Sequence, residues 1–323
     1  MSEIRVLTPL EFAVDAPWPG TESVVLKHSP IENTVDHIGD CDVLWTQFFT
    51  AEMAERATKL RLIQSTGAGI ELIDLDAVPP GCDVAVVHEH ERPMAEWVIM
   101  AMIALNRDTL RADATLRSGS WELGYFRQPT IPELSEQTLG IIGFGHIGQQ
   151  TARFASALGM KVIAATRTPD RVANPAELGV SRVVGLEEMG TVLAESDFVL
   201  LATALTSDTT GLIGGKELAL MSPQSSLINV ARARVVDEDA LFAALRNRDI
   251  KSAALDVWWG EPLAPDQKPD PSRHPFSDLD NVLMSPHVSA MTVGTWKRRI
   301  QAAADNIDRL VRGEPIQNVI HSG

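Results

Sequence analysis

Three segments of the sequence each deliver a side chain with acid, base or anion-binding chemistry. The residues are Arg232, Glu261 and His287, and each follows a short apolar run that predicts a buried β-strand. In an open α/β sheet, ligands bind outside the carboxyl ends of the strands. We therefore expect the three side chains to meet at one edge of a sheet.

These residue types suit the reduction of a carbonyl group. A guanidinium binds a carboxylate through two parallel hydrogen bonds; we assign this role to Arg232, with Arg234 as the alternative. An imidazole can give a proton to the carbonyl oxygen and take it back in the reverse reaction, which is the role expected for His287. A hydrogen bond from His287 to Glu261 would orient the ring and raise its pKa. Taken singly, a turn histidine or a solvated loop carboxylate would explain the same residues.

A glycine-rich turn forms the second functional motif. Residues 138–148 read Thr-Leu-Gly-Ile-Ile-Gly-Phe-Gly-His-Ile-Gly, with the GxGxxG pattern at Gly143, Gly145 and Gly148, after an apolar strand and before a helical stretch. The first glycine permits the tight turn, the second lets the backbone approach a pyrophosphate, and the third lets helix and strand pack closely. The helix N-terminus adds N–H groups, including the backbone amide of His146. A dinucleotide site is predicted, with a ligand-free tight turn as the alternative.

The strand expected at 161–166 ends without the carboxylate that would bind the ribose hydroxyls of NAD. Arg167 stands at its tip instead, and an arginine can hold a 2′-phosphate by charge-assisted hydrogen bonds. We therefore predict NADP as the preferred cofactor, with NAD possible. The alternative is that Arg167 stacks on adenine or faces water.

Length and charge limit the classes of partner. The chain has 323 residues, which favours two domains. Its 28 basic and 43 acidic residues give a formal net charge of −15, which argues against nucleic acid and anionic membranes as partners. No apolar stretch approaches the roughly 20 residues of a membrane span, and the N-terminus does not resemble a signal peptide. With Cys41 and Cys82 expected as reduced thiols, a cytoplasmic location is predicted.

These residues are positioned by predicted strands and helices. Short apolar runs alternate with helical stretches along the chain, which is typical of α/β proteins. In the first part we expect strands at the N-terminus and at 23–27, 43–45, 60–65 and 84–87. In the second part we expect strands at 138–142, 161–166, 182–184, 198–203, 226–230, 253–257 and 282–285. A long helix is expected at 94–118, crossing between the two lobes. A last helix at 295–312, closed by Gly313, is expected to return to the first lobe before an extended tail at 316–320.

With these segments in place, the sequence resembles the D-isomer-specific 2-hydroxyacid dehydrogenase family, which includes phosphoglycerate dehydrogenase and glyoxylate/hydroxypyruvate reductase. The resemblance covers nearly the whole chain and includes Ser65-Thr-Gly-Ala-Gly-Ile70, Ala95-Glu96 and the stretch 205–213, Leu-Thr-Ser-Asp-Thr-Thr-Gly-Leu-Ile. The Arg–Glu–His set corresponds to the catalytic triad of that family. The resemblance implies hydride transfer between NAD(P)H and a small 2-keto or D-2-hydroxy acid.

The family pattern also implies contacts for further residues. The substrate carboxylate would meet the backbone of Ala68 and Gly69. The pyrophosphate would meet His146 and Ile147. The nicotinamide side of the cleft would be lined by Thr203, Val230 and Ala231, and Asp256 would accept a hydrogen bond from the carboxamide.

The resemblance implies two Rossmann-like, doubly wound parallel-sheet domains. The substrate domain would be discontinuous, at 1–101 and 290–323, around a dinucleotide-binding domain at 102–289. It also implies a homodimer formed through the cofactor lobe; Trp121, Tyr125 and Phe126 are candidates for that contact.

The sequence departs from the family pattern at three positions. Ala233 stands where glycine is usual, Ala204 where proline is usual, and His88 where asparagine is common. His88 and His90 could also be metal ligands, but no third ligand is evident, so no metal is expected.

Other activities of the same fold remain as alternatives. Formate dehydrogenases carry glutamine at the position of Glu261, and phosphite dehydrogenase uses a lysine near the first-lobe glycine segment, where 65–70 has none. Dinucleotide-sensing corepressors of the C-terminal-binding type share the fold and triad but carry partner-binding extensions, which are not expected after the final tail. The sequence does not specify the acid; with NADP, reduction is the expected direction.

Overall fold

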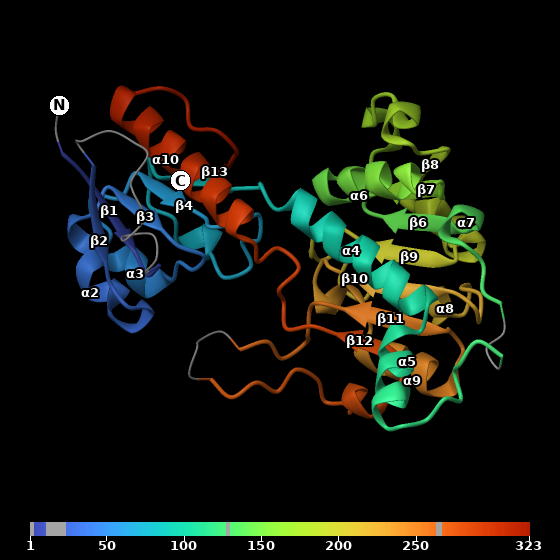
Figure 1. Ribbon diagram of the computed structural model, residues 1–323. Coiled ribbons are helices and arrows are strands. Elements are labelled where there is room, and N and C mark those ends of the chain that lie inside the picture. Colours follow the sequence, from blue (N-terminus) through green and yellow to red (C-terminus); the bar gives the residue numbers. More distant parts are fainter. Residues whose placement is uncertain (1–2, 11–23, 127–129, 263–266) are drawn as a thin grey trace. The chain divides into compact units, whose positions relative to one another are not determined.

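The protein is described by a computed structural model that covers residues 3–10, 24–126, 130–262 and 267–323. It forms two compact units, each with its own sheet (Figure 1). Unit 1 consists of Met1–His90 with Met291–Gly323, and unit 2 of Glu91–Ala290. The predicted class, two α/β domains built on parallel sheets, is confirmed.

Within the described residues, unit 1 contains a six-stranded sheet in the order β13-β5-β4-β3-β1-β2. Its strands are β1 (Ile4–Thr8), β2 (Val24–His28), β3 (Val43–Trp45), β4 (Leu62–Gln64), β5 (Asp83–Ala85) and β13 (Val319–Ser322). Neighbouring strands are parallel except at the edge, where β13 pairs with β5 in the antiparallel sense. The chain end that was expected as an extended tail is therefore an edge strand.

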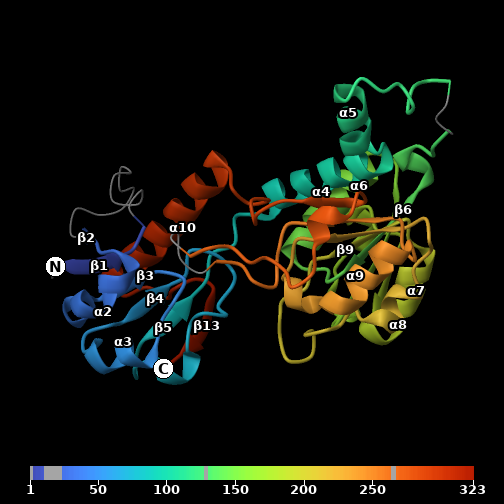
Figure 2. The same ribbon diagram turned by 90° about the horizontal axis from the view of Figure 1, so that it is seen from below.

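Helices cover both faces of this sheet (Figure 2). Those on one face are α2 (Thr34–His37) and α3 (Ala51–Arg56), and the other face is covered by α10 (Val293–Arg312). The hydroxyl of Thr292 caps α10 by accepting from the backbone N–H of Thr295, and Gly313 ends it in the left-handed conformation at φ 67°. The amphipathic stretch at the end of the chain thus packs on unit 1.

Unit 2 contains, in the part of the chain described, a seven-stranded parallel sheet in the order β12-β11-β10-β9-β6-β7-β8. Its strands are β6 (Thr138–Ile142), β7 (Lys161–Thr166), β8 (Arg182–Gly185), β9 (Phe198–Leu201), β10 (Ser226–Asn229), β11 (Ser252–Leu255) and β12 (Val282–Met284). They are almost continuously apolar, as expected for strands buried on both faces. The strand order reverses between β6 and β9, so the switch point at which such sheets bind ligands lies at their carboxyl ends.

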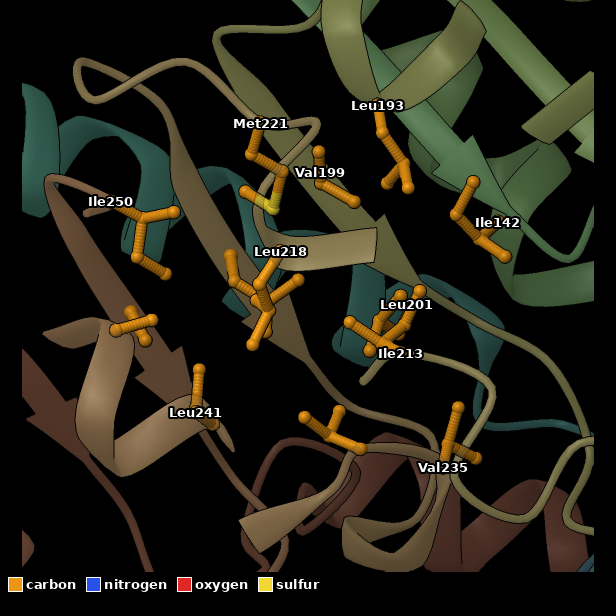
Figure 3. Close-up of a cluster of buried hydrophobic side chains, with 14 of the residues drawn as sticks. Ile142, Leu193, Val199, Leu201, Ile213, Leu218, Met221, Val235, Leu241 and Ile250 are labelled. Atoms are coloured by element: carbon orange, nitrogen blue, oxygen red, sulfur yellow. The ribbon is translucent and has the colours of Figure 1, made fainter. Parts of the chain in front are cut away.

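Helices also cover both faces of the second sheet. One face carries α4 (Glu91–Asn106) and α6 (His146–Ala157); the other carries α7 (Met189–Glu195), α8 (Gly215–Leu218) and α9 (Glu238–Asn247). Figure 3 shows the second of these interfaces, where Leu193, Leu218 and Leu241 point toward the sheet. Each such buried leucine stabilises the fold by about 1.5–3 kcal/mol. This packing fixes the sheet edge on which the candidate site is built.

The single helix expected at 94–118 is in fact two helices. The first, α4, ends at Asn106, and α5 (Thr109–Arg117) starts after Asp108, whose φ of 51° interrupts the helical backbone. The buried side of α4 packs into the core of unit 2. For this reason unit 2 begins at Glu91, before α4, whereas the sequence placed the boundary after residue 101.

Both cysteines are buried free thiols. Burial raises the pKa of Cys41 to about 11 and that of Cys82 to about 12, so both remain protonated at neutral pH. Among the helices of the described residues, none is long and apolar enough to cross a membrane.

Candidate active site

The glycine-rich turn lies between β6 and α6. Gly143 has φ 96°, and a Cβ there would lie 2.6 Å from the backbone of Ala202 and Thr203. A Cβ on Gly148 would lie 2.5 Å from the carbonyl oxygen of Gly143. Gly145 differs, because a Cβ there would meet nothing within 4 Å. Two of the glycines are thus required by the fold itself, while the third leaves open space at the N-terminus of α6.

Two more arginines lie near the tip of β7, in addition to Arg167, which the sequence already indicates. Arg167 is exposed there, next to a cavity of about 460 Å³ in unit 2. Arg153 and Arg171 line this cavity, together with the carboxylate of Glu177. The sequence pointed only to Arg167, because the other two arginines come from α6 and from the loop after β7.

The turn after β10 presents Arg232. The side chain of Asn229, almost fully buried, accepts from the backbone N–H of Ala231 at 3.0 Å and donates to the carbonyl oxygen of Arg232 at 3.1 Å. Arg232 is partly buried, whereas Arg234 is exposed. Of the two arginines weighed from the sequence, Arg232 is the one that this turn holds at the sheet edge.

His287 and Glu261 come together as a hydrogen-bonded pair. His287 follows β12 and Glu261 follows β11, and these strands are parallel neighbours. Nδ1 of His287 donates to Oε2 of Glu261 at 2.7 Å. The backbone N–H of Trp258 donates to the other oxygen, Oε1, at 2.8 Å. The pairing expected from the sequence is present, and it leaves Nε2 of the imidazole available for proton transfer.

The electrostatics of the pair favour the charged imidazolium. The hydrogen bond to Glu261 raises the pKa of His287, while burial and the charge of Arg232 act in the opposite direction without cancelling it. Burial raises the pKa of Glu261, but the hydrogen bond and charge of His287, the N–H of Trp258 and the charge of Arg232 together outweigh it, so the net shift is downward. Glu261 is therefore ionised at neutral pH and His287 holds its proton to a higher pH than a free imidazole.

Asp256 is fully buried, and its carboxylate accepts hydrogen bonds from the loop that follows β12. Oδ1 accepts from the hydroxyl of Ser285 at 2.5 Å and from the N–H of Val288 at 2.9 Å; Oδ2 accepts from the N–H of Ser289 at 2.8 Å. The family resemblance implies that Asp256 accepts a hydrogen bond from a carboxamide. In the structure, its visible role is to hold the loop that carries His287.

Several residues that shape this edge had no clear signal in the sequence. Trp258 is buried beside the pair, and Ser289 carries a buried hydroxyl without a hydrogen-bond partner in the described structure. A cavity of about 550 Å³ adjoins the pair in unit 2; besides Glu261 and His287 it is lined by Trp258, Pro262, Pro269, Pro271, Met284, Ser285 and Pro286. Serine and tryptophan residues often follow strands. The sequence alone therefore does not show that these two residues belong to the site, because it does not show which loops meet.

The remaining residues expected at the cofactor lie at the ends of neighbouring strands. Thr203 follows β9 and is partly buried, and Val230 and Ala231 follow β10 and are buried. His146 and Ile147 form the first turn of α6. All of them share the carboxyl edge of the unit 2 sheet with the glycine turn, because the strands are parallel.

The predicted substrate-carboxylate segment belongs to unit 1. It follows β4, and its turn is held by the hydroxyl of Ser65, which accepts from the N–H of Gly67 at 3.4 Å. Ala68 is exposed and Gly69 partly exposed. This segment of unit 1 is thus a short loop whose shape depends on internal hydrogen bonds.

His88 and His90 form a local contact. Nδ1 of His90 donates to the carbonyl oxygen of His88 at 2.6 Å, so this ring atom is already engaged. In the described parts of the chain, no cluster of three or more His, Cys, Asp or Glu side chains is placed to hold a metal ion.

The chain is similar to known proteins over most of its length. Residues 99–289 match the family described as "D-isomer specific 2-hydroxyacid dehydrogenase, NAD binding domain". The chain is 34% identical to D-3-phosphoglycerate dehydrogenase of Methanocaldococcus jannaschii over 297 residues, 90% of this chain and 53% of that protein. It is 32% identical to glyoxylate reductase of Thermococcus gammatolerans over 306 residues, 92% of this chain and 86% of that protein. The chain thus spans about half the length of the phosphoglycerate dehydrogenase.

Solved structures show the same architecture. D-lactate dehydrogenase of Lactobacillus jensenii with NAD⁺ superposes with a TM-score of 0.79 at 27% identity, covering 98% of this chain and 99% of that one. The TT0316 protein of Thermus thermophilus gives a TM-score of 0.81 at 27% identity, covering 98% and 100%. The fold and the sheet-edge site define a dinucleotide-binding α/β protein. The chain belongs to the D-isomer-specific 2-hydroxyacid dehydrogenase family.

Proposed function

We propose that the protein is a D-2-hydroxyacid dehydrogenase that reduces a small 2-keto acid with a nicotinamide dinucleotide. The observation that carries this proposal is the 2.7 Å hydrogen bond between His287 and Glu261, at the sheet edge that also presents Arg232 and the glycine turn. This combination supplies a proton donor, a carboxylate-binding group and a dinucleotide-binding turn. Family membership supports the same reaction class.

The glycine turn fits a dinucleotide. The open space at Gly145 would allow a pyrophosphate to approach the backbone, and the N–H groups of His146 and Ile147 in the first turn of α6 would bind it. Thr203, Val230 and Ala231 would line the nicotinamide. When bound, the reduced nicotinamide supplies the hydride.

His287 would supply the proton. Because Nδ1 donates to Glu261, the proton for the carbonyl oxygen is held on Nε2. As the carbonyl carbon gains hydride, its oxygen takes this proton and His287 becomes neutral; the reverse reaction returns the proton to the same atom. The ionised Glu261 stabilises the imidazolium before transfer and keeps the ring oriented throughout.

Arg232 would bind and orient the substrate carboxylate. Its guanidinium, whose Nη1 donates to the carbonyl oxygen of Ala231 at 2.8 Å, would turn its other donors to the carboxylate. The family resemblance implies that the backbone amides of Ala68 and Gly69 would add two more donors. Holding the carboxylate fixes where the neighbouring carbonyl lies with respect to the proton and the hydride. The positive charges of Arg232 and His287 would also polarise the carbonyl.

We further propose that NADPH is preferred over NADH. The residues 164–168 at the tip of β7 include no carboxylate that would bind ribose hydroxyls, and Arg167 is exposed there. Arg153 and Arg171, which line the adjacent cavity, add positive charge for a 2′-phosphate. Glu177 in the same cavity opposes them in part.

A parallel kinetic assay tests the reaction and the cofactor together. NADPH and NADH would each be supplied with glyoxylate, hydroxypyruvate, pyruvate, phenylpyruvate or 2-ketoisocaproate, and the loss of reduced-nicotinamide absorbance followed. We expect turnover with one or more acids and a higher kcat/KM with NADPH. Arg167→Ala should lower kcat/KM with NADPH about tenfold while changing it less than about twofold with NADH. Cofactor binding without turnover of any acid would contradict the enzymatic proposal and favour a dinucleotide sensor.

We also propose that the protein forms a homodimer through unit 2. A continuous stretch of this unit exposes large apolar side chains, namely Met100, Ile103, Leu110, Leu116, Trp121, Tyr125 and Phe126. Such side chains are enriched at interfaces between subunits. The partner that we propose for them is a second copy of this chain, as the family resemblance implies.

A further inference from the structure

Trp258 contacts the loops that carry both members of the acid–base pair. It is 8% exposed and follows β11 by three residues. Its backbone N–H donates to Oε1 of Glu261 at 2.8 Å, and its indole Nε1–H donates to the carbonyl oxygen of Ser285 at 2.8 Å. Ser285 lies two residues before His287. One residue therefore bridges the β11 loop and the β12 loop.

The backbone contact fixes the carboxylate of Glu261. With Oε1 held by the N–H of Trp258, Oε2 is the oxygen that meets the imidazole of His287. A carboxylate held at both oxygens has little freedom to rotate away from its partner. The orientation of Glu261 thus depends on the position of the Trp258 backbone.

The indole contact acts on the other member of the pair. His287 has φ 55°, in the left-handed region that residues with a Cβ adopt uncommonly, although histidine does so more often than most. On its carboxyl side the loop is held by Asp256, which accepts from the N–H of Val288. On its amino side, the indole of Trp258 holds the carbonyl of Ser285, and Asp256 accepts from the hydroxyl of the same serine. The left-handed histidine is therefore held from both directions.

We propose that Trp258 is a positioning residue for proton transfer, because its indole holds the His287 loop at the distance from Glu261 that their hydrogen bond requires. The expected effect of Trp258 on the reaction rate rests on the proposed function. Its expected effect on the position of the His287 loop does not. The charged groups that act on His287 are Glu261, Arg232 and Asp256, and replacing Trp258 by phenylalanine alters none of them. That replacement keeps an aromatic ring and the backbone donor; it removes the indole N–H together with part of the ring volume, a loss of volume that the control variant described next shares.

Trp259 offers a matched control. Its indole Nε1–H donates to the carbonyl oxygen of Val236 at 3.2 Å, away from the pair. Its ring stacks on Phe276 with centroids 5.7 Å apart, and the ring of Trp258 packs edge-on against the same Phe276 at 6.0 Å. Trp259→Phe therefore loses a comparable hydrogen bond in the same aromatic cluster without touching the His287 loop.

The kinetic test compares Trp258→Phe with Trp259→Phe. Misalignment of a supporting contact commonly costs about tenfold in rate, so we expect Trp258→Phe to lower kcat about tenfold and to change the Kd of NADPH less than about twofold. Since the hydrogen bond to Glu261 is the main cause of the raised pKa of His287, the alkaline limb of the kcat/KM profile should move to lower pH. Trp259→Phe should keep the wild-type kcat and profile.

A second measurement does not depend on turnover. The ring of His287 is titrated by NMR in protein labelled with ¹³C-histidine, and His287→Gln assigns its signal. A lower pKa of His287 in Trp258→Phe, with an unchanged pKa in Trp259→Phe, supports the proposal. A wild-type titration in Trp258→Phe, or the same downward shift in both variants, overturns it. If wild-type protein reduces no 2-keto acid, the proposed function fails, and the titration still decides the role of Trp258.

Discussion

The proton-transfer step of the proposed reaction depends on a single hydrogen bond, between Nδ1 of His287 and Oε2 of Glu261. This bond raises the pKa of His287. Reduction needs the imidazolium, so its rate should be constant at low pH and fall as the pH rises through the raised pKa. Oxidation needs the neutral ring and should show the opposite dependence. We therefore expect different pH optima for the two directions of the proposed reaction.

Glu261→Gln tests this account of the pH dependence. The amide keeps the shape of the side chain and removes its negative charge, so the pKa of His287 should fall and the alkaline limb of reduction should move to lower pH. We expect kcat to drop about tenfold or more, because the ring is also less well oriented. The measurement is kcat/KM for reduction between pH 5 and pH 9, a range of about two units or more on each side of neutrality. An unshifted limb would show that Glu261 does not set the protonation of His287.

Arg232→Ala and Arg234→Ala form a matched pair. Arg232 is partly buried and held by Asn229, whereas Arg234 is exposed. Loss of Arg232 should raise KM for the 2-keto acid about tenfold or more and also lower kcat, since the carboxylate is neither bound nor oriented. Arg234→Ala should leave both constants within about twofold of wild type. Equal effects of the two variants would argue against the assignment of Arg232.

The reactive residues themselves could be predicted from the sequence, but their supports could not. Arg232, Glu261 and His287 each follow an apolar strand, and their types are those that carbonyl reduction needs. The roles of Trp258 and Asp256 depend on hydrogen bonds to a loop about thirty residues away in the sequence, and spacing alone does not reveal such partners. The role of Asp256 as a carboxamide acceptor stays a prediction of the family resemblance; the structure adds that its carboxylate holds the His287 loop.

At the scale of elements, the strands of the parallel sheets were the easiest to predict. Fully buried strands such as β9 and β10 are short apolar runs bounded by polar residues, so their positions can be predicted from the sequence. The break between α4 and α5 was missed because the apolar residues keep their helical spacing across it. The left-handed backbone of Asp108, which makes the break, leaves no periodic signal.

The glycine turn allows the fold and cofactor binding to be separated. A Cβ on Gly148 would lie 2.5 Å from the carbonyl oxygen of Gly143, so Gly148→Ala should lower the free energy of unfolding by about 1–3 kcal/mol. A Cβ on Gly145 meets nothing, so Gly145→Ala should change it by less than about 0.5 kcal/mol. The added methyl would nevertheless occupy the approach of a pyrophosphate and raise the Kd of NADPH about tenfold or more.

Denaturant unfolding followed by circular dichroism and cofactor titration followed by fluorescence provide the two measurements. Wild-type cofactor affinity in Gly145→Ala would show that the phosphates do not approach the backbone at this residue. A stability loss in Gly145→Ala as large as that in Gly148→Ala would contradict the packing argument.

At the scale of the whole molecule, the net charge of −15 contrasts with the local chemistry of the site. The overall field repels an anionic acid and an anionic dinucleotide, so the proposed binding of both would depend on local cations such as Arg232 and Arg167. Screening by salt weakens the overall repulsion and the local attraction alike.

The proposed homodimer is a property of the whole molecule that a single chain does not display. Tyr125 and Phe126 are almost fully exposed, with rings 5.0 Å apart in an edge-to-face arrangement, and Trp121 lies close to them in the sequence. Aromatic side chains of this kind often dominate the free energy of association. We expect the wild-type protein to sediment with about twice the 35.1 kDa mass of the chain at micromolar concentration.

The triple variant Trp121→Ser, Tyr125→Ser, Phe126→Ser should raise the dimer dissociation constant at least about tenfold, which corresponds to about 1.4 kcal/mol of association free energy. Ile31→Ser removes an exposed apolar side chain from unit 1 and serves as the control, with sedimentation expected to match wild type. Sedimentation velocity across a concentration series gives the constants. A wild-type monomer at every concentration would exclude the dimer, and a triple variant that dimerises as tightly as wild type would exclude these aromatic residues from its interface.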